Sequence, residues 1–120
     1  MHTIIPGMVT RAGKLSHTYG VMGGHYQPMG HAHVLTNHFD FGMDPQAAID
    51  APRLRTNAWG PVETEAGIGP DVREKLIGMG HDIVDSPVPV GGAQMIHIDW
   101  DHGVLTGGSD PRKDGQAAGY

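Results

Sequence analysis

Two adjacent glycines, Gly23 and Gly24, are the strongest candidate for chemistry in this sequence. They stand where an expected strand ends and an expected helix begins. Because glycine has no side chain, its backbone N–H can approach a bound group closely and its backbone can adopt left-handed angles. The helix N-terminus nearby adds positive partial charge, which suits an anion or a developing oxyanion. The pair is therefore a candidate oxyanion hole. The alternative interpretation is a tight strand-to-helix turn that binds nothing.

Histidine is the other unusual residue type, with nine copies. His31 and His33, with His25 nearby, could form an imidazole cluster. On a helix, however, residues two apart point roughly 200 degrees apart, so His31 and His33 cannot both face one ion. His31 and His38 lie two turns apart, which is too far for joint ligation. Since no His-x-x-Glu-His pattern occurs either, we expect no metal site and no cofactor.

Other common catalytic patterns are missing from the sequence. There is no cysteine, which excludes disulfides, Cys-ligated zinc, iron–sulfur clusters and thiol nucleophiles. Ser16, Ser86 and Ser109 do not lie in a Gly-x-Ser-x-Gly elbow. The sequence also contains no phosphate-binding P-loop and no dinucleotide fingerprint.

The elements that must position the glycine pair are a hairpin before it and a helix after it. Period-two alternation on both sides of a Gly-containing turn predicts a hairpin over residues 4–10 and 15–22. Apolar residues at three- and four-residue spacing then predict a helix over 28–41. A second helix is expected over 44–52, with Asp44 as its N-cap.

The remaining pattern predicts a short strand at 62–66, a helix at 70–79, a short strand at 83–84 and a hairpin formed by 95–100 and 104–106. Residues 53–61 show no regular pattern, and residues 107–120 form a polar, Gly-rich tail. Because hairpins dominate, the expected fold class is α+β, with a mainly antiparallel sheet and helices packed on it. With a length of 120 residues, the chain is expected to form a single, partial domain over 1–120.

Charge and hydropathy exclude two classes of partner. Eight basic residues against thirteen acidic ones give a net charge of −5, so we expect no nucleic-acid partner held by a basic surface. No apolar stretch approaches the roughly 20 residues that span a bilayer, and no signal-peptide core is present, so no membrane partner is expected. The compartment stays open between cytoplasm and periplasm.

Five motifs occur in order along the chain. They are Gly-Val-Met-Gly-Gly-His at 20–25, Asp-Phe-Gly-Met-Asp-Pro-Gln-Ala-Ala-Ile-Asp-Ala-Pro-Arg at 40–53, Glu-x-Gly-Ile with a following helix and Gly-His at 65–81, Gly-x-Gln at 92–94, and Gly-Gly-Ser-Asp-Pro-Arg-Lys-Asp-Gly at 107–115. Together they resemble the C-terminal part of the small subunit of the gamma-glutamyltranspeptidase family. The resemblance covers practically the whole chain.

The resemblance implies an N-terminal nucleophile hydrolase with a four-layer αββα fold, of which this chain would form a portion. Family members are precursors that cleave themselves and free a threonine, which attacks a gamma-glutamyl amide and passes the acyl group to water or an amino acid. The glycines that match Gly23 and Gly24 supply the oxyanion-hole N–H groups. A Ser-Ser pair that contacts the glutamyl group falls on His2 and Thr3.

The chain also departs from the family pattern. The family's threonine lies well upstream of the glycine pair, so these 120 residues are expected to lack the nucleophile and to be inactive alone. His-Thr in place of Ser-Ser also puts strict gamma-glutamyl specificity in doubt.

Two hypotheses follow. The first is part of a transferase or hydrolase whose partner is the upstream or large-subunit portion and whose substrate is a gamma-glutamyl-type small molecule. The alternative is a non-catalytic binding or assembly module that keeps the fold. Because the sheets would be incomplete, we expect their exposed edges to produce an oligomer.

Overall fold

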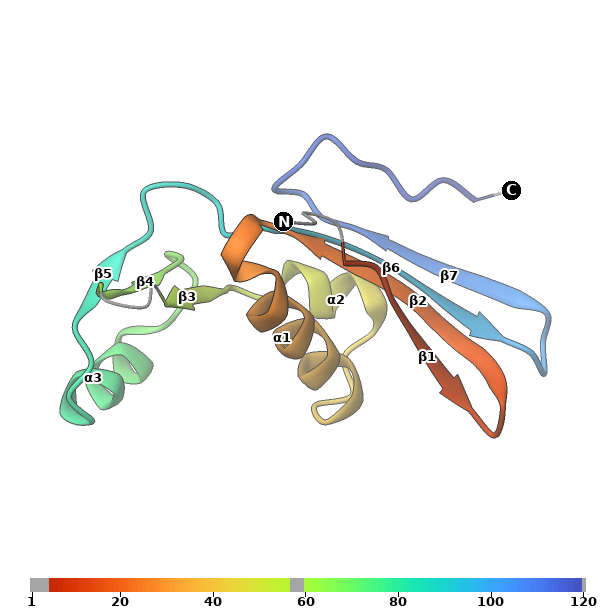
Figure 1. Ribbon diagram of the computed structural model, residues 1–120, viewed down its shortest axis with the longest axis horizontal. Helices are drawn as coiled ribbons and strands as arrows, with labels where there is room; N and C mark the ends of the chain where they lie inside the picture. Colours follow the sequence, from red (N-terminus) through yellow and green to blue (C-terminus); the bar gives the residue numbers. More distant parts are fainter. Residues whose placement is uncertain (1–4, 57–59, 120) are drawn as a thin grey trace. The chain divides into compact units, whose positions relative to one another are not determined.

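The computed structural model describes residues 5–56 and 60–119, which fall into two compact units. The first unit comprises residues 1–50 and 91–120, and the second comprises residues 51–90. Figure 1 shows the elements of both units in sequence colours. That 1–120 form a single partial domain stays a prediction, because two compact units can belong to one domain.

The first unit is built on a four-stranded antiparallel sheet in the order β1 (Gly7–Arg11), β2 (Lys14–Met22), β6 (Gly92–Asp99) and β7 (Val104–Ser109). The β1–β2 turn contains Ala12 and Gly13 at φ 49° and 78°, the left-handed angles that tight hairpin turns require. In the centre of the sheet, β2 pairs with β6, so that Val21 lies opposite Ala93. The chain segment after residue 91 therefore completes the sheet that the first residues begin.

Two helices, α1 (Gln27–Phe39) and α2 (Pro45–Asp50), pack on one face of this sheet. The buried apolar side chains of this layer are Val21, Val34, Ala48, Ile49, Ala93 and Met95. The opposite face carries Met8, Ile96 and Leu105, which are exposed. The helices thus bury one face of the sheet and leave the other open.

The second unit is a small sheet in the order β3 (Leu54–Thr56), β4 (Val62–Thr64) and β5 (Ile83–Asp85). The β3–β4 pair is antiparallel, whereas β4 and β5 are parallel and are connected through α3 (Pro70–Gly78). Helix α3 starts at a proline in its first turn, and Gly80 after it takes φ 92°, which suits a helix C-terminus. This unit buries Arg53, Val62, Thr64 and Val90.

The α+β class, with a mainly antiparallel sheet and helices packed on it, is confirmed. Three local predictions need correction. Residues 54–56 form β3, although no pattern was expected there, because pairing with β4 and the Arg55–Glu63 ion pair supply what local sequence lacks. Strand β6 begins at Gly92 and β7 extends to Ser109, into the expected tail. There, Gly108 fits because a Cβ on it would come within 2.9 Å of Ile49 Cδ1.

Candidate active site

Gly23 and Gly24 lie between the end of β2 and the start of α1, as the sequence predicts. Gly23 has φ 142° and Gly24 has φ 59°, values that glycine adopts most readily. A single 3₁₀ turn, η1 (Gly24–Tyr26), follows the pair and leads into α1, and the Tyr26 N–H donates to Gly23 O at 3.2 Å. The first N–H groups of such a helical segment have no partner within it. The junction therefore has the left-handed backbone and the helical start that the sequence analysis expected of this glycine pair.

The two glycines differ in their surroundings. A Cβ on Gly23 would lie 3.2 Å from Gly91 Cα and 3.3 Å from Tyr26 Cδ1. A Cβ on Gly24 would meet no atom within 4 Å. Gly23 is therefore required by packing as well as by its backbone angle. At position 24 only the backbone angle favours glycine, and the surroundings leave room for a bound group.

The imidazole of His31 fixes the start of α1 to the end of β2. Its Nε2 accepts a hydrogen bond from the Val21 N–H at 3.0 Å. Burial lowers the pKa of His31 below its usual value, which keeps the ring neutral and able to accept this bond. The structure thus places a half-buried histidine next to the candidate site.

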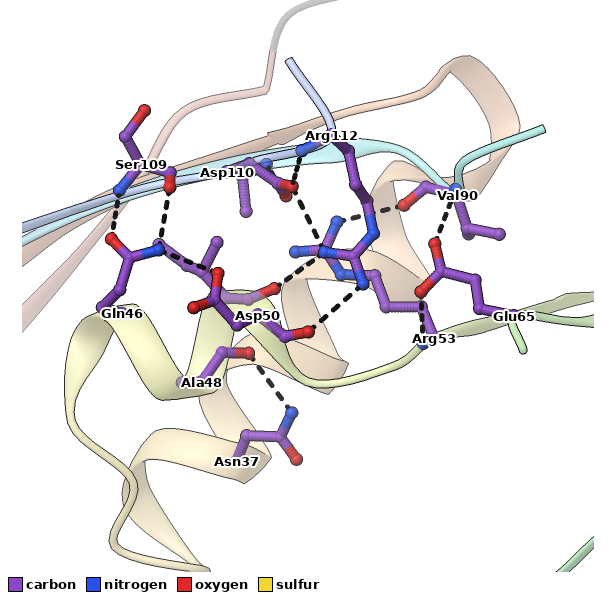
Figure 2. A network of polar contacts seen from close by, with 12 residues as sticks. Asn37, Gln46, Ala48, Asp50, Arg53, Glu65, Val90, Ser109, Asp110 and Arg112 are labelled. Atoms are coloured by element: carbon purple, nitrogen blue, oxygen red, sulfur yellow. Dashed lines mark hydrogen bonds and ion pairs between the residues drawn. The ribbon is translucent and has the colours of Figure 1, made fainter. Parts of the chain in front are cut away.

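Asp110 and Arg112, within the motif at 107–115, connect the end of β7 to the start of β6 and to α2 (Figure 2). The Asp110 carboxylate accepts hydrogen bonds from the Ala93 N–H at 2.7 Å and from the Arg112 N–H at 2.9 Å. The Arg112 guanidinium donates to Asp110 at 3.2 Å and to Ile49 O at 3.0 Å. These two motif residues therefore hold the backbone of the first unit together.

Gln46 on α2 uses both ends of its side-chain amide to hold Ser109 (Figure 2). Its Nε2 donates to Ser109 O at 2.9 Å, and its Oε1 accepts from Ser109 N at 3.0 Å. The amide thus makes the bonds that a neighbouring strand would make to the end of β7.

In the second unit, the Glu65 carboxylate joins two backbone segments. One oxygen accepts from the Arg53 N–H at 2.8 Å and the other from the Val90 N–H at 2.9 Å. The Arg53 guanidinium in turn donates to Val90 O at 3.0 Å. The motifs at 40–53 and 65–81 therefore contribute residues that stabilise this unit.

Two predicted site residues, His2 and Thr3, lie outside the described residues. Within the residues that are described, no group of three or more His, Asp or Glu side chains is arranged to hold a metal ion. The described helices likewise include none that is long and apolar enough to cross a membrane.

Sequence analysis missed a cluster of three imidazoles. His17 on β2 and His97 on β6 are stacked with ring centroids 4.6 Å apart, and His38 on α1 lies edge-on to His17 at 4.8 Å. Their separation in sequence hides the cluster, because only the β2–β6 register places His17 opposite His97.

Comparison with known proteins extends these findings. The family model described as gamma-glutamyltranspeptidase matches residues 1–120. Among curated proteins, the chain is 37% identical over 126 residues to the glutathione hydrolase-like YwrD proenzyme of Bacillus subtilis, covering 98% of this chain and 24% of that protein. It is 34% identical to an acylase ACY 1 proenzyme of a Pseudomonas species, covering 94% of this chain and 20% of that protein. The chain thus spans less than a quarter of the length of either relative.

Solved structures give the same result. The cephalosporin acylase of Bacillus halodurans matches with a TM-score of 0.93 and 42% identity, covering 99% of this chain and 23% of that one. A gamma-glutamyltranspeptidase of Pseudomonas nitroreducens matches with a TM-score of 0.87 and 26% identity, covering all of this chain and 63% of that one. The ordered motifs, the fold and the whole-chain match agree, and the chain belongs to the gamma-glutamyltranspeptidase family of N-terminal nucleophile hydrolases.

Proposed function

We propose that this chain is the C-terminal portion of an enzyme that hydrolyses or transfers an acyl group held in an amide, and that Gly23 and Gly24 supply its oxyanion hole. The nucleophile is an N-terminal threonine that lies outside these 120 residues, as the family resemblance implies. The chain's own contribution is electrostatic. It presents two amide donors to the oxygen that becomes negative when the acyl carbon turns tetrahedral.

The observation that carries the proposal is the pair of backbone angles at the end of β2. Angles of 142° and 59° turn the chain from a strand into a helix within two residues. This sharp turn leaves successive N–H groups near the surface, since Gly23 and Gly24 are both exposed. The positive end of α1 begins four residues after Gly23 and favours a developing negative charge.

The substrate class is an acyl amide of a small molecule, of the gamma-glutamyl type or related to it. The relatives include glutathione hydrolase proenzymes, acylase proenzymes and an oxamate amidohydrolase proenzyme. Breaking an amide through a tetrahedral intermediate is chemistry that one oxyanion hole can serve for all these substrates. His2 and Thr3 are proposed to contact the acyl group, where the family has two serines.

The partner is the remaining portion of the same enzyme. The curated relatives are proenzymes several times longer than this chain. The open face of the first unit's sheet carries exposed apolar side chains, with Met8 71% and Leu105 67% exposed. A second sheet packed on this face would bury these side chains and form the inner two layers of an αββα arrangement.

The test is to remove one amide donor without disturbing the backbone. In the full-length enzyme, replacement of the Gly24 amide by an ester exchanges N–H for oxygen and adds no side chain. We expect kcat with gamma-glutamyl p-nitroanilide to fall roughly a hundred- to a thousandfold. Gly24→Pro is less informative, because proline fixes φ near −65° and Gly24 has φ 59°.

His25→Ala is the matched control, because it keeps both glycines with their N–H groups and changes only an exposed side chain. We expect this variant to keep kcat within about tenfold of wild type, a small change beside the loss expected for the ester. Chain cleavage must be normal in both proteins. A processed ester enzyme with near-normal turnover would place the oxyanion hole elsewhere, whereas a processed wild-type protein without turnover would favour the binding or assembly module.

A further inference from the structure

His17 and His38 form the centre of a hydrogen-bonded chain that crosses the first unit. His38 Nδ1 lies 2.7 Å from Met43 O, and His38 Nε2 lies 2.9 Å from His17 Nε2. His17 Nδ1 lies 3.0 Å from Ser16 Oγ, which lies 3.1 Å from Val9 O. This hydrogen-bonded chain thus has four contacts and ends in a carbonyl oxygen on each side. It connects β1, β2, the end of α1 and the loop after α1.

When both imidazoles are neutral, this hydrogen-bonded chain has one proton fewer than it has contacts. A carbonyl oxygen only accepts, so both ends need a donor from within the chain. Four contacts require four protons. Two neutral imidazoles and one hydroxyl supply three, one from each group.

The two protonation states therefore differ in the direction of the bonds. One contact of the neutral chain must lack a hydrogen, and we assign this to the longest, Ser16 Oγ–Val9 O at 3.1 Å, so that Ser16 donates to His17 Nδ1 and His17 Nε2–H donates to His38 Nε2. With one added proton, both nitrogens of His38 donate, His17 Nδ1–H donates to Ser16, and Ser16 donates to Val9 O. All four contacts then carry a hydrogen, in agreement with the distances of 2.7–3.1 Å.

We propose that His17 and His38 together form a binding site for one proton, which His38 holds, and that proton binding changes the tautomer of His17 and closes the Ser16–Val9 hydrogen bond. His17 itself stays neutral in both states. The site links the edge strand β1 to the end of α1 in a pH-dependent way.

Burial and nearby charges limit the site to a single proton. Both histidines line a cleft of about 560 Å3 together with Arg11, Lys14, His97 and Trp100. Burial first, and then the charges of His38, His97 and Arg11, lower the pKa of His17 to about 4. A second proton is therefore taken up only in acid, well below the ordinary histidine range of about 6.5.

The acidic groups near the cleft do not take the place of the added proton in the hydrogen-bonded chain of His17 and His38. Asp99 Oδ2 contacts His102 Nδ1 at 2.7 Å, and its Oδ1 accepts the Asp101 N–H at 3.0 Å, so its own turn uses both oxygens. Asp101 is exposed, as are Asp40 and Asp44 in the loop that carries Met43. Helix α1 itself contains no Asp, Glu, Lys or Arg.

The test is nitrogen NMR of the full-length protein labelled with 15N at histidine, with His17 and His38 assigned through His17→Gln and His38→Gln. Between pH 8 and 5 we expect His17 to change from the Nε2–H to the Nδ1–H tautomer without becoming charged. The midpoint of this change should coincide with uptake of one proton by the His17–His38 pair. A His17 ring that keeps one tautomer, or that becomes charged at that midpoint, would overturn the proposal.

A pair of serine variants tests the mechanism separately. Ser16→Ala removes the group that accepts from His17 Nδ1, so we expect proton affinity to fall roughly three- to tenfold, the value of one hydrogen bond. Ser86→Ala is the matched control, because Ser86 Oγ also donates to a backbone carbonyl, Val88 O at 2.7 Å, but belongs to the second unit. An unchanged midpoint in Ser16→Ala, or an equal shift in Ser86→Ala, would contradict the role of Ser16.

Discussion

The carboxylate of Asp110 accepts the backbone N–H of Ala93 at 2.7 Å, so a side chain just after the last strand holds the backbone of the central strand β6. Asp110 is fully buried, and the Arg112 guanidinium compensates its charge. A buried carboxylate is stable only with such partners. This contact explains why a Ser-Asp-Pro-Arg segment is part of the fold rather than a loose tail.

Asp110→Ala should therefore destabilise the protein by about 3–5 kcal/mol, because it leaves the Arg112 charge without its carboxylate and the Ala93 N–H without an acceptor. Denaturant unfolding measures the loss. The matched control is Asp101→Ala, an exposed acidic residue, which should change stability by less than about 0.5 kcal/mol. Equal effects of the two variants would mean that the Asp110 contacts contribute nothing.

Gly23→Ala should destabilise the protein more than Gly24→Ala. Alanine at position 24 needs only a left-handed angle, at about 1–2 kcal/mol. At position 23 it needs φ 142° and also places its Cβ 3.2 Å from Gly91 Cα. Midpoints of unfolding for both variants would check this order. The reverse order would contradict the tight contact between Gly23 and Gly91.

The 120-residue chain by itself should neither hydrolyse nor transfer a gamma-glutamyl anilide. The reason is that an N-terminal threonine must act as nucleophile, with its own amine as base. The measurement is release of p-nitroaniline by the purified chain, with and without the upstream portion expressed separately. Activity that appears only with both portions would support the proposed assembly, whereas turnover by the chain alone would disprove it.

Stability should fall as the pH drops from about 6.5 to about 4. His17, which is 4% exposed, has its pKa lowered to about 4 in the fold, whereas the unfolded chain binds a proton there near 6.5. In this range the unfolded state holds up to one more proton, so acid favours unfolding. Thermal melting against pH should be less steep for His17→Gln than for wild type.

The control for this pH dependence is His81→Gln, which changes an exposed histidine of the second unit. This variant should keep the wild-type slope between pH 6.5 and 4. If His17→Gln kept that slope as well, the proton linkage would belong to other groups.

The isolated chain should associate through the open face of its sheet and through the edge strands β1 and β7. Leu105→Lys places a charge on this face, where Leu105 is exposed, and should shift sedimentation towards monomer. Lys75→Leu, which removes a charge from the exposed surface of α3, should not reduce association. A monomeric wild-type chain at high concentration would refute the expectation of an oligomer.

The sequence by itself determined the elements with strong local signals. The alternation over 15–22, the Asp44 N-cap of the second helix and the pattern over 70–79 all predicted elements that the structure contains. The strand-to-helix junction at Gly23 and Gly24 could also be predicted, because a glycine pair between a strand repeat and a helix repeat has few structural explanations. The family followed from the order of five motifs.

Tertiary structure alone decided what depends on contacts between distant segments. Strand β3 forms because β4 pairs with it, and β7 extends to Ser109 because Gln46, 63 residues earlier, holds its end. The imidazole cluster exists because the β2–β6 register and the packing of α1 bring His17, His97 and His38 together. No local pattern encodes such pairings, since register and side-chain contacts are set by the packing of the whole sheet.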